Sequence, residues 1–270
     1  MNICLLFHCL CESYEHLPQH GQELFASITD VHTMIEDLSR RGYKFGTMDD
    51  STSQTVSITF DDGYHNNLLF DPLAHFYGIP YVIFTSAYYN LTGDPYPWFY
   101  TNGLGYSDVH SFNFYDQYQE IRQVQNGTPT DELIRPLTLA ELDNLRKSSL
   151  AEVGCHGYYH QPLSRSYEKY LHQELEQALG CLKEALNIRP RYFSLANGMY
   201  TKWVMRQLLN TFERVFTIEG RPYHQNDRTI HRITLLNPNI AGPLIQQIDR
   251  HLKTVRQVRR TIRSFVRSIG

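Results

Sequence analysis

Two neighbouring carboxylates, Asp61 and Asp62, follow a stretch with the alternating pattern of a β-strand. Apolar and small polar residues alternate over residues 56–60, and Gly63 comes directly after the acid pair. Consecutive strand side chains point to opposite faces, so the two carboxylates can share a site only if the backbone bends, which Gly63 permits. Unpaired neighbouring carboxylates repel, which favours a cation between them or a raised pKa for one. The alternative is a solvated Asp-Asp-Gly turn.

A second cluster, His156 and His160, lies almost a hundred residues further along. Histidines four apart also occur by chance on helix faces, but Gly157 and Gln161-Pro162 favour a loop. With Asp62 they make two imidazoles and one carboxylate, a set that suits Zn²⁺ and leaves room for water and substrate. The sequence therefore predicts a centre for a divalent metal ion, with zinc as first choice.

The elements that must position these residues alternate between strands and helices. We expect strands at 2–10, 56–60, 81–85, around 153, 192–195, 214–218 and 229–236, and helices at about 29–42, 67–76, 139–147, 167–186 and 202–212. This order implies right-handed crossovers and a parallel sheet, and at this length we expect the sheet to close into a barrel. Residues that follow barrel strands meet at one face. Five polar residues follow predicted strands and are therefore expected at this face: Asp61, Asp62, His156, His160 and Asn197.

Composition is that of one globular domain with a full core. The 270 residues are 41% hydrophobic, and no apolar run approaches the length of a membrane span. Residues 1–7 lack a basic region and read as a first strand instead of a signal peptide. Five cysteines without CxxC spacing favour a reducing compartment, so we expect a cytoplasmic protein, and we expect no nucleic-acid partner.

Two segments stand apart from the barrel pattern. Residues 86–136 are irregular and rich in Tyr, Asn and Gly, which is typical of a functional lid or binding loop; Trp98 within it either lines the cleft or packs the insertion. We place the barrel at 1–243 and a basic amphipathic helix at 244–270. From residue 250 onward there are seven basic residues and no acid. This helix either docks on the acidic barrel or lies on a membrane surface over anionic headgroups.

The two clusters together resemble the first two motifs of the polysaccharide deacetylase family, the NodB homology domain of carbohydrate esterase family 4. The first motif is residues 59–64 (Thr-Phe-Asp-Asp-Gly-Tyr), and the second is residues 156–160 (His-Gly-Tyr-Tyr-His). Leu6-Phe7-His8 resembles the opening strand of the family, and the resemblance extends from about residue 2 to residue 236. It implies a single-domain α/β fold, a distorted (β/α) barrel with a divalent metal, usually zinc.

Carried over by position, the resemblance implies a role for each motif residue. Asp62, His156 and His160 become metal ligands, and Asp61 becomes the general base. A third motif, residues 191–200, supplies a backbone N–H to the oxyanion. We expect contacts to the substrate or the oxyanion from Asn197, Gly198, Tyr64 and Trp98.

The third motif also departs from the family pattern. Ala196 replaces the usual proline, and Ser194 occupies the position of the arginine that tunes the base in other branches. Arg191 is either a substitute for that arginine or a solvated residue at the strand edge. No clear copy exists of the motif whose histidine protonates the leaving amine; His231 is our candidate, against a structural role. His8 is the other histidine that we expect in the cleft.

The expected activity is metal-dependent removal of an acyl group, first of all N-acetyl, from a sugar, a polysaccharide or a lipid-linked glycan. Two alternatives stay open from the sequence. One is a catalytically silent sugar-binding or scaffold protein, which would have no reason to keep both the metal ligands and the base. The other is a deformylase acting on a lipid-linked amino sugar. The expected partner is therefore an N-acylated carbohydrate, with peripheral membrane contact through residues 250–270.

Overall fold

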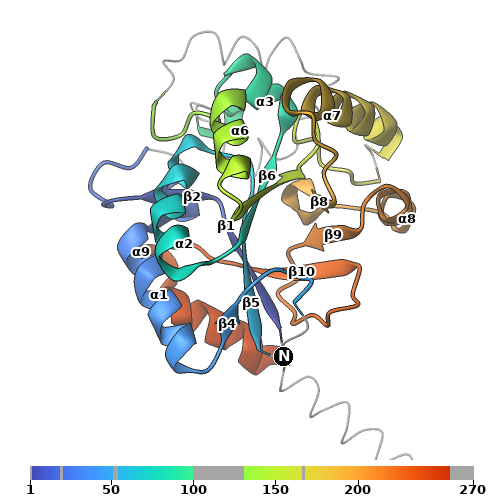
Figure 1. Ribbon diagram of the computed structural model, residues 1–270. Coiled ribbons are helices and arrows are strands. Elements are labelled where there is room, and N and C mark those ends of the chain that lie inside the picture. The colour runs from blue at the N-terminus through green and yellow to red at the C-terminus, as the bar shows by residue number, and fades with distance from the viewer. Residues whose placement is uncertain (1, 19–20, 51–53, 100–130, 166–167, 256–270) are drawn as a thin grey trace, which may run out of the picture.

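The computed structural model describes residues 2–18, 21–50, 54–99, 131–165 and 168–255. Its centre is a parallel sheet that closes on itself (Figure 1). Around the barrel the strands are β1 (Ile3–Phe7), β10 (Thr229–Thr234), β9 (Arg214–Thr217), β8 (Tyr192–Ser194), β7 (Ala151–Cys155), β6 (Tyr81–Thr85) and β5 (Thr55–Phe60). Pairing of β1 with β5 closes the ring, and the short β4 (Lys44–Phe45) adds to the first residues of β5. The predicted (β/α) barrel is confirmed.

Side chains alternate between the inside of the barrel and the layer under the helices, as strand geometry requires. The inner cluster contains Cys4, Phe84, Phe216 and Ile230, and the outer layer contains the remaining apolar strand residues packed against helices. Predicted strand positions agree within one or two residues except at the N-terminus. There the expected strand 2–10 divides at His8 into β1 and β2 (Cys9–Cys11), and β2 pairs with β3 (Phe25–Ser27) in a separate small sheet.

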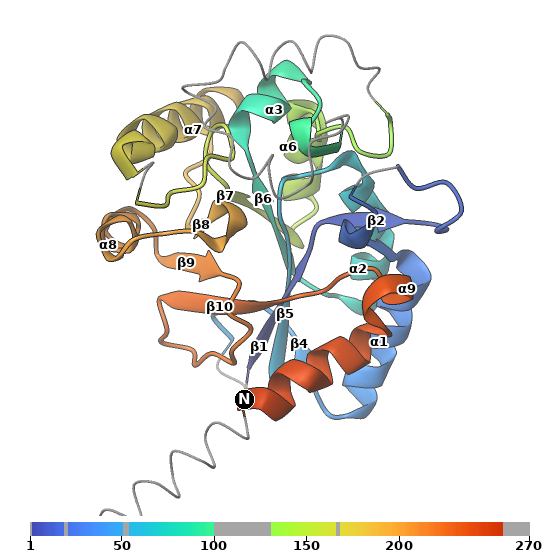
Figure 2. The same cartoon turned by 180° about the vertical axis from the view of Figure 1, so that it is seen from behind.

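Helices surround the barrel: α1 (Ile28–Arg40), α2 (Asp71–Tyr77), α6 (Leu139–Lys147), α7 (Leu171–Leu186), α8 (Lys202–Thr211) and the short α9 (Pro238–Ala241) (Figures 1 and 2). A capping box begins α6, with Thr138 and Glu141 bonded reciprocally, as the Thr-x-x-Glu spacing in the sequence indicates. The helix expected at 67–76 is a 3₁₀ segment, His65–Phe70, followed by α2. Pro72 stands in the first turn of α2, where its missing N–H costs nothing.

Part of the segment predicted to be irregular is ordered. Within 86–136 the chain forms α3 (Ala87–Thr92) and a 3₁₀ turn, Pro97–Phe99. These elements bury an aromatic cluster that includes Tyr64, Tyr96 and Trp98. Residues 100–130 lie outside the described part of the chain, so a lid there stays a prediction.

The basic tail begins as a helix docked on the barrel. Residues 244–255 are helical, and Leu244, Ile248 and Leu252 are buried in the main core. Figure 2 shows this helix beside α1. Asp249 of the helix forms an ion pair at 2.9 Å with Arg41, the residue that follows α1. Residues 256–270 lie outside the described range, so membrane contact stays a prediction. No helix in the described ranges is long and apolar enough to cross a membrane.

Candidate active site

The carboxyl ends of β5, β7 and β8 bring the predicted site residues to one face of the barrel. A cavity of about 530 Å³ opens there. Its walls include the acid pair, both motif histidines and several apolar side chains: Leu6, His8, Glu23, Leu24, Asp61, Asp62, Trp98, His156, His160, Leu195, Asn197, Gly198, Ile218, Thr234 and Leu236.

The backbone bend required between the two aspartates occurs at Asp62 itself. Asp62 has a φ of 71° and Gly63 a φ of 72°, both in the left-handed region. A non-glycine residue rarely adopts this conformation, and it is typical of functional sites. Asp61 and Asp62 are each only 3% exposed. The solvated turn, which the sequence left open, is therefore wrong.

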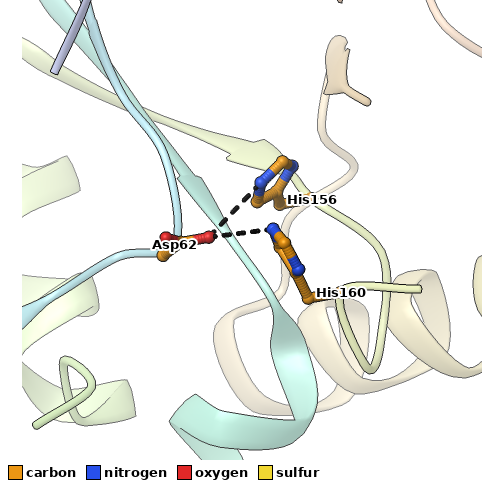
Figure 3. A group of neighbouring side chains, drawn as sticks. All are labelled: Asp62, His156 and His160. Carbon is orange, nitrogen blue, oxygen red and sulfur yellow. Dashed lines mark ion pairs between the residues drawn. The ribbon is translucent and has the colours of Figure 1, made fainter. Parts of the chain in front are cut away.

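Asp62, His156 and His160 converge on one point (Figure 3). Oδ1 of Asp62 lies 3.4 Å from Nε2 of His156 and 3.2 Å from Nε2 of His160. This buried oxygen accepts no hydrogen bond from any described residue. One nitrogen from each ring and one carboxylate oxygen all lie within 4.8 Å of one another. An orphaned carboxylate oxygen facing two imidazole nitrogens fits a divalent ion such as Zn²⁺.

Surrounding groups fix the orientation of these donors. Nδ1 of His156 lies 2.9 Å from the carbonyl oxygen of Ser194, which leaves Nε2 free to face the site. The hydroxyl of Tyr64 donates to Oδ2 of Asp62 at 2.7 Å, and Nε1 of Trp98 donates to the Tyr64 oxygen at 2.8 Å. The expected substrate contact of Tyr64 is wrong, because Tyr64 is fully buried behind Asp62. Trp98 packs the insertion and also reaches the cavity wall, with its ring 4.8 Å from that of His160.

Asp61 is held by a guanidinium that the sequence analysis did not identify. Arg232 on β10 is fully buried, and its two terminal nitrogens donate to Oδ1 and Oδ2 of Asp61 at 2.6 and 2.7 Å. Ser194 joins the pair: its hydroxyl accepts from Arg232 at 2.7 Å and donates to Asp61 at 3.1 Å. Oδ2 of Asp61 lies 3.8 Å from Nε2 of His156, at the edge of the point where the three donors converge.

Charges within the site set the ionisation of its members. Burial raises the pKa of Asp61, but the charge and hydrogen bonds of Arg232 together with the nearby histidines outweigh it, and the pKa ends below its ordinary value. Burial likewise opposes ionisation of Asp62, yet the nearby histidines, His160 first, lower its pKa. Burial would lower the pKa of His156, but the carboxylates of Asp61 and Asp62 hold it above the ordinary value. Both aspartates are therefore ionised at neutral pH.

Arg232 replaces the arginine that the third motif lacks. The guanidinium comes from β10, whereas the family position for it falls on Ser194 of β8. The signal was present in the sequence: residues 229–234 are predicted to form a strand, and one face of that strand carries Arg232 between Ile230 and Thr234. Arg191 does not substitute, because it lies outside the barrel and pairs with Glu213 and Asp49.

His231 lies on the opposite face of the same strand from Arg232. Its ring contacts Glu219 and Thr217, and it lines a different cavity from the one that contains Asp61. The expected role as the acid for the leaving amine is therefore wrong, because strand alternation turns the ring out of the barrel. His8 lines the cavity as expected, and its buried Nδ1 has no hydrogen-bond partner within the described ranges.

Asn197 and Gly198 form part of the cavity wall, but they differ in what they can donate. The N–H of Gly198 is engaged by the carbonyl oxygen of Leu195 at 3.0 Å. The side-chain Nδ2 of Asn197 is buried and donates to no group in the described part of the chain. Asn197 has a φ of 53°, another left-handed residue at this face. Of the two, Asn197 is the available donor.

One anchor of the histidine loop also escaped the sequence analysis. Glu174 on α7 is 1% exposed and accepts the backbone N–H groups of Tyr158 and Tyr159 at 2.5 and 3.2 Å. A Cβ atom at Gly157 would lie 2.5 Å from this carboxylate, so the loop passes against Glu174 closely. In the sequence Glu174 is an acid on the apolar face of a helix, the signal that was overlooked.

A closed parallel barrel with an acid pair and two histidines at its carboxyl face defines a class of barrel hydrolases. The family model for polysaccharide deacetylase matches residues 49–213, which is more than half of the chain. The chain belongs to the polysaccharide deacetylase family, a class of hydrolases that act on carbon–nitrogen bonds. No curated protein matches the sequence significantly.

Solved structures of deacetylases share the fold. The Streptococcus pyogenes deacetylase PplD, solved in complex with acetate, gives a TM-score of 0.63 at 14% identity, covering 91% of this chain and 96% of that one. A de-N-acetylase from Aggregatibacter actinomycetemcomitans gives 0.62 at 15% identity, covering 87% and 94%. A polysaccharide deacetylase from Bacillus cereus gives 0.61 at 13% identity, covering 87% of this chain but only 65% of that longer one.

Proposed function

We propose that this protein removes an N-acetyl group from an amino sugar of a glycan by metal-dependent hydrolysis. Asp62, His156 and His160 hold the ion, and Asp61 is the general base. The observation that carries the proposal is Oδ1 of Asp62, a buried carboxylate oxygen that faces two imidazole nitrogens and has no hydrogen-bond donor among the described residues. Family membership and two structural neighbours, one a deacetylase solved in complex with acetate and one a de-N-acetylase, support the acetyl group.

A bound divalent ion supplies two effects at this point: it lowers the pKa of a water molecule and polarises the acyl carbonyl. The residues of the chain do the rest. Asp61 lies beside the ion site and stays ionised, so it can accept the proton of the attacking water. Arg232 and Ser194 hold its carboxylate in one orientation. The free Nδ2 of Asn197 is the donor that we assign to the developing oxyanion.

We assign protonation of the leaving amine to His8 in place of His231. His8 lines the same cavity as Asp61 and Asp62. Burial is the larger effect and leaves the pKa of His8 below its ordinary value, although the two carboxylates act in the opposite direction. His8→Gln removes the ring that would carry the proton, so it should slow turnover while the protein keeps its metal. Full activity of this variant would show that His8 does not protonate the leaving amine.

A catalytically silent scaffold is the weaker alternative. Buried charges are costly unless they are paired, and the Asp61–Arg232 pair lies inside the barrel, where an apolar pair of similar volume would fold as well. A scaffold has no need of the pair or of an orphaned carboxylate oxygen. Both features support an active enzyme.

Metal analysis combined with product detection tests the proposal. Purified protein should contain about one divalent ion. Incubation with N-acetylated and N-formylated sugars should release acetate in preference to formate, as measured by mass spectrometry. Asp61→Asn should keep the ion and lose on the order of 10²-fold or more in turnover, because it removes the base and leaves the three metal ligands in place.

His156→Ala and His160→Ala should lose the ion, because two remaining ligands hold zinc poorly. His75→Ala is the matched control, since this half-exposed histidine pairs with Asp71 on α2, away from the cavity. Full metal content in both ligand variants would exclude the metal site. Full turnover of Asp61→Asn would exclude Asp61 as the general base. Formate as the sole product would show that the acyl group removed is formyl and not acetyl.

A further inference from the structure

A second cavity, of about 740 Å³, lies beside the active site. It is bounded by the segment after β9, the outer face of β10 and the docked helix 244–255: Glu219, Gly220, Arg221, Pro222, His224, Asp227, His231, Arg250, His251, Thr254 and Val255. Ile218 lines the active-site cavity and Glu219 lines this one, so a single ridge of chain separates them. The cavity walls begin after residue 213, where the family match ends.

Two arginines line this cavity, and neither guanidinium has a carboxylate of the described ranges within hydrogen-bond distance. Arg250 donates to the carbonyl oxygen of Ala241, and no carboxylate of the described ranges pairs with it. Arg221 is 58% exposed and forms an ion pair with Glu219 at 3.8 Å, which is longer than a hydrogen bond. Burial and then the charge of Arg250 lower the pKa of His251, as expected where positive groups gather.

The acids of the cavity are already engaged by other groups. Glu219 accepts hydrogen bonds from Thr217, His231 and, at 2.9 Å, Tyr200. Oδ2 of Asp227 accepts the backbone N–H of His224 at 2.7 Å. His231 connects the two sides, because it contacts Glu219 through Nδ1 and lies 3.2 Å from Arg221 through Nε2. With Nδ1 protonated, Nε2 accepts from Arg221 and helps to hold that guanidinium in place.

We infer that this cavity binds a phosphate group carried by the glycan substrate, with Arg221 and Arg250 as its main contacts. Guanidinium groups recognise phosphate with charge-assisted, often bidentate hydrogen bonds. The volume exceeds what a phosphate needs, so an attached sugar also fits. The inference rests on the proposed function, and it narrows the substrate class to an acylated amino sugar with a phosphate ester.

Calorimetric titration of the metal-loaded protein tests the inference with three probes: inorganic phosphate, N-acetylglucosamine 1-phosphate and N-acetylglucosamine. Both phosphates should bind, and Arg221→Gln and Arg250→Gln should each weaken them by about tenfold or more. Arg206→Gln, an exposed arginine on α8 outside the cavity, is the matched control and should change nothing. Arg221 is mostly exposed, so its variant should fold, and thermal unfolding of each variant checks this.

Kinetics provide the second readout. Arg221→Gln should raise KM for a phosphorylated substrate and leave kcat, and turnover of the unphosphorylated sugar, unchanged. Phosphate binding that is insensitive to both arginine variants would place the anion on the metal and overturn the inference. Failure of both phosphates to bind the wild-type protein would overturn it as well. Arginine-dependent binding in a protein that releases no acyl group would uphold the phosphate site and overturn only the proposed activity.

Discussion

At the scale of single residues, the reactivity of Asp61 depends on Arg232. A carboxylate inside a barrel would ordinarily be protonated, because burial disfavours its charge. The bidentate contact with a fully buried guanidinium keeps it ionised, and the rings of Phe84 and Phe216 pack near that guanidinium at 5.4 and 5.8 Å. The pair therefore supplies a base of fixed orientation and restricted basicity.

Arg232→Met should leave Asp61 as a buried, unpaired charge. We expect a loss of about 3–5 kcal/mol in the free energy of unfolding. The double variant Asp61→Asn/Arg232→Met removes both charges and should recover most of that loss. Urea unfolding of the wild type, both single variants and the double variant measures this. A double variant as unstable as Arg232→Met alone would show that the two residues are not coupled.

Metal affinity should depend on pH through His156. Its pKa is raised by Asp61 and Asp62, so without the ion it stays protonated to a higher pH than an ordinary histidine. Binding must displace that proton, so affinity should be full above the raised pKa and fall by up to about tenfold per pH unit below it. Competition with a chelator between pH 5.5 and 8.5 measures this. Affinity that is constant across the range would contradict it.

At the scale of elements, the loop between β7 and α7 turns two histidines toward one carboxylate. Its last ligand, His160, has a φ of 61°, and Gly157 has a φ of 85°. Such a loop does not hold its shape through local propensity. The buried Glu174 carboxylate on α7 binds two of its backbone N–H groups and so links the ligand loop to a helix of the outer layer.

Glu174→Ala should loosen the ligand loop without touching a ligand. We expect metal affinity to fall by about 10–100-fold, the range seen when outer-shell partners of a metal site are removed. Glu174→Gln should lose less, because one oxygen can still accept. Glu176→Ala, an exposed glutamate on the same helix, is the control. If Glu174→Ala binds zinc as tightly as Glu176→Ala does, Glu174 does not position the metal ligands.

At the scale of the whole molecule, the chain carries a net charge of −3 although it ends in a basic segment. The first part of that segment, residues 244–255, packs against the barrel, because Leu244, Ile248 and Leu252 are buried in the core. The membrane hypothesis therefore narrows to residues 256–270, which contain five arginines and no acid. Each such charge near an anionic surface contributes about 1 kcal/mol.

Truncation after Val255 should abolish sedimentation with anionic vesicles and leave folding intact, since the three buried leucine and isoleucine side chains remain. The full chain should sediment with such vesicles at low salt and less at high salt. Neutral vesicles provide the control for both forms. Equal sedimentation of the full and truncated chains would leave residues 256–270 without this role.

The amino-acid sequence alone determined which residues meet at the carboxyl face. Alternation over residues 56–60 and the capping box at Thr138 are local signals, and the order of strands and helices implied the barrel that brings Asp62, His156 and His160 together. The bend at Asp61-Asp62 was also inferred correctly, although it falls on Asp62 as well as on Gly63. Such features follow from contacts close in sequence, or from a chain order with few possible topologies.

Only the tertiary structure decided which charged groups serve these residues. Arg232 reaches Asp61 across 171 positions, and Glu174 reaches the histidine loop from a separate helix. Tyr64 lies behind Asp62, whereas Trp98 packs the insertion and also reaches the cavity wall. His231 does not reach the active site, whereas its neighbour Arg232 does, because adjacent strand residues face opposite sides. Only the closed barrel shows which side is the inside. Pairing partners of a buried charge depend on the register of strands far apart in sequence, which no local pattern specifies.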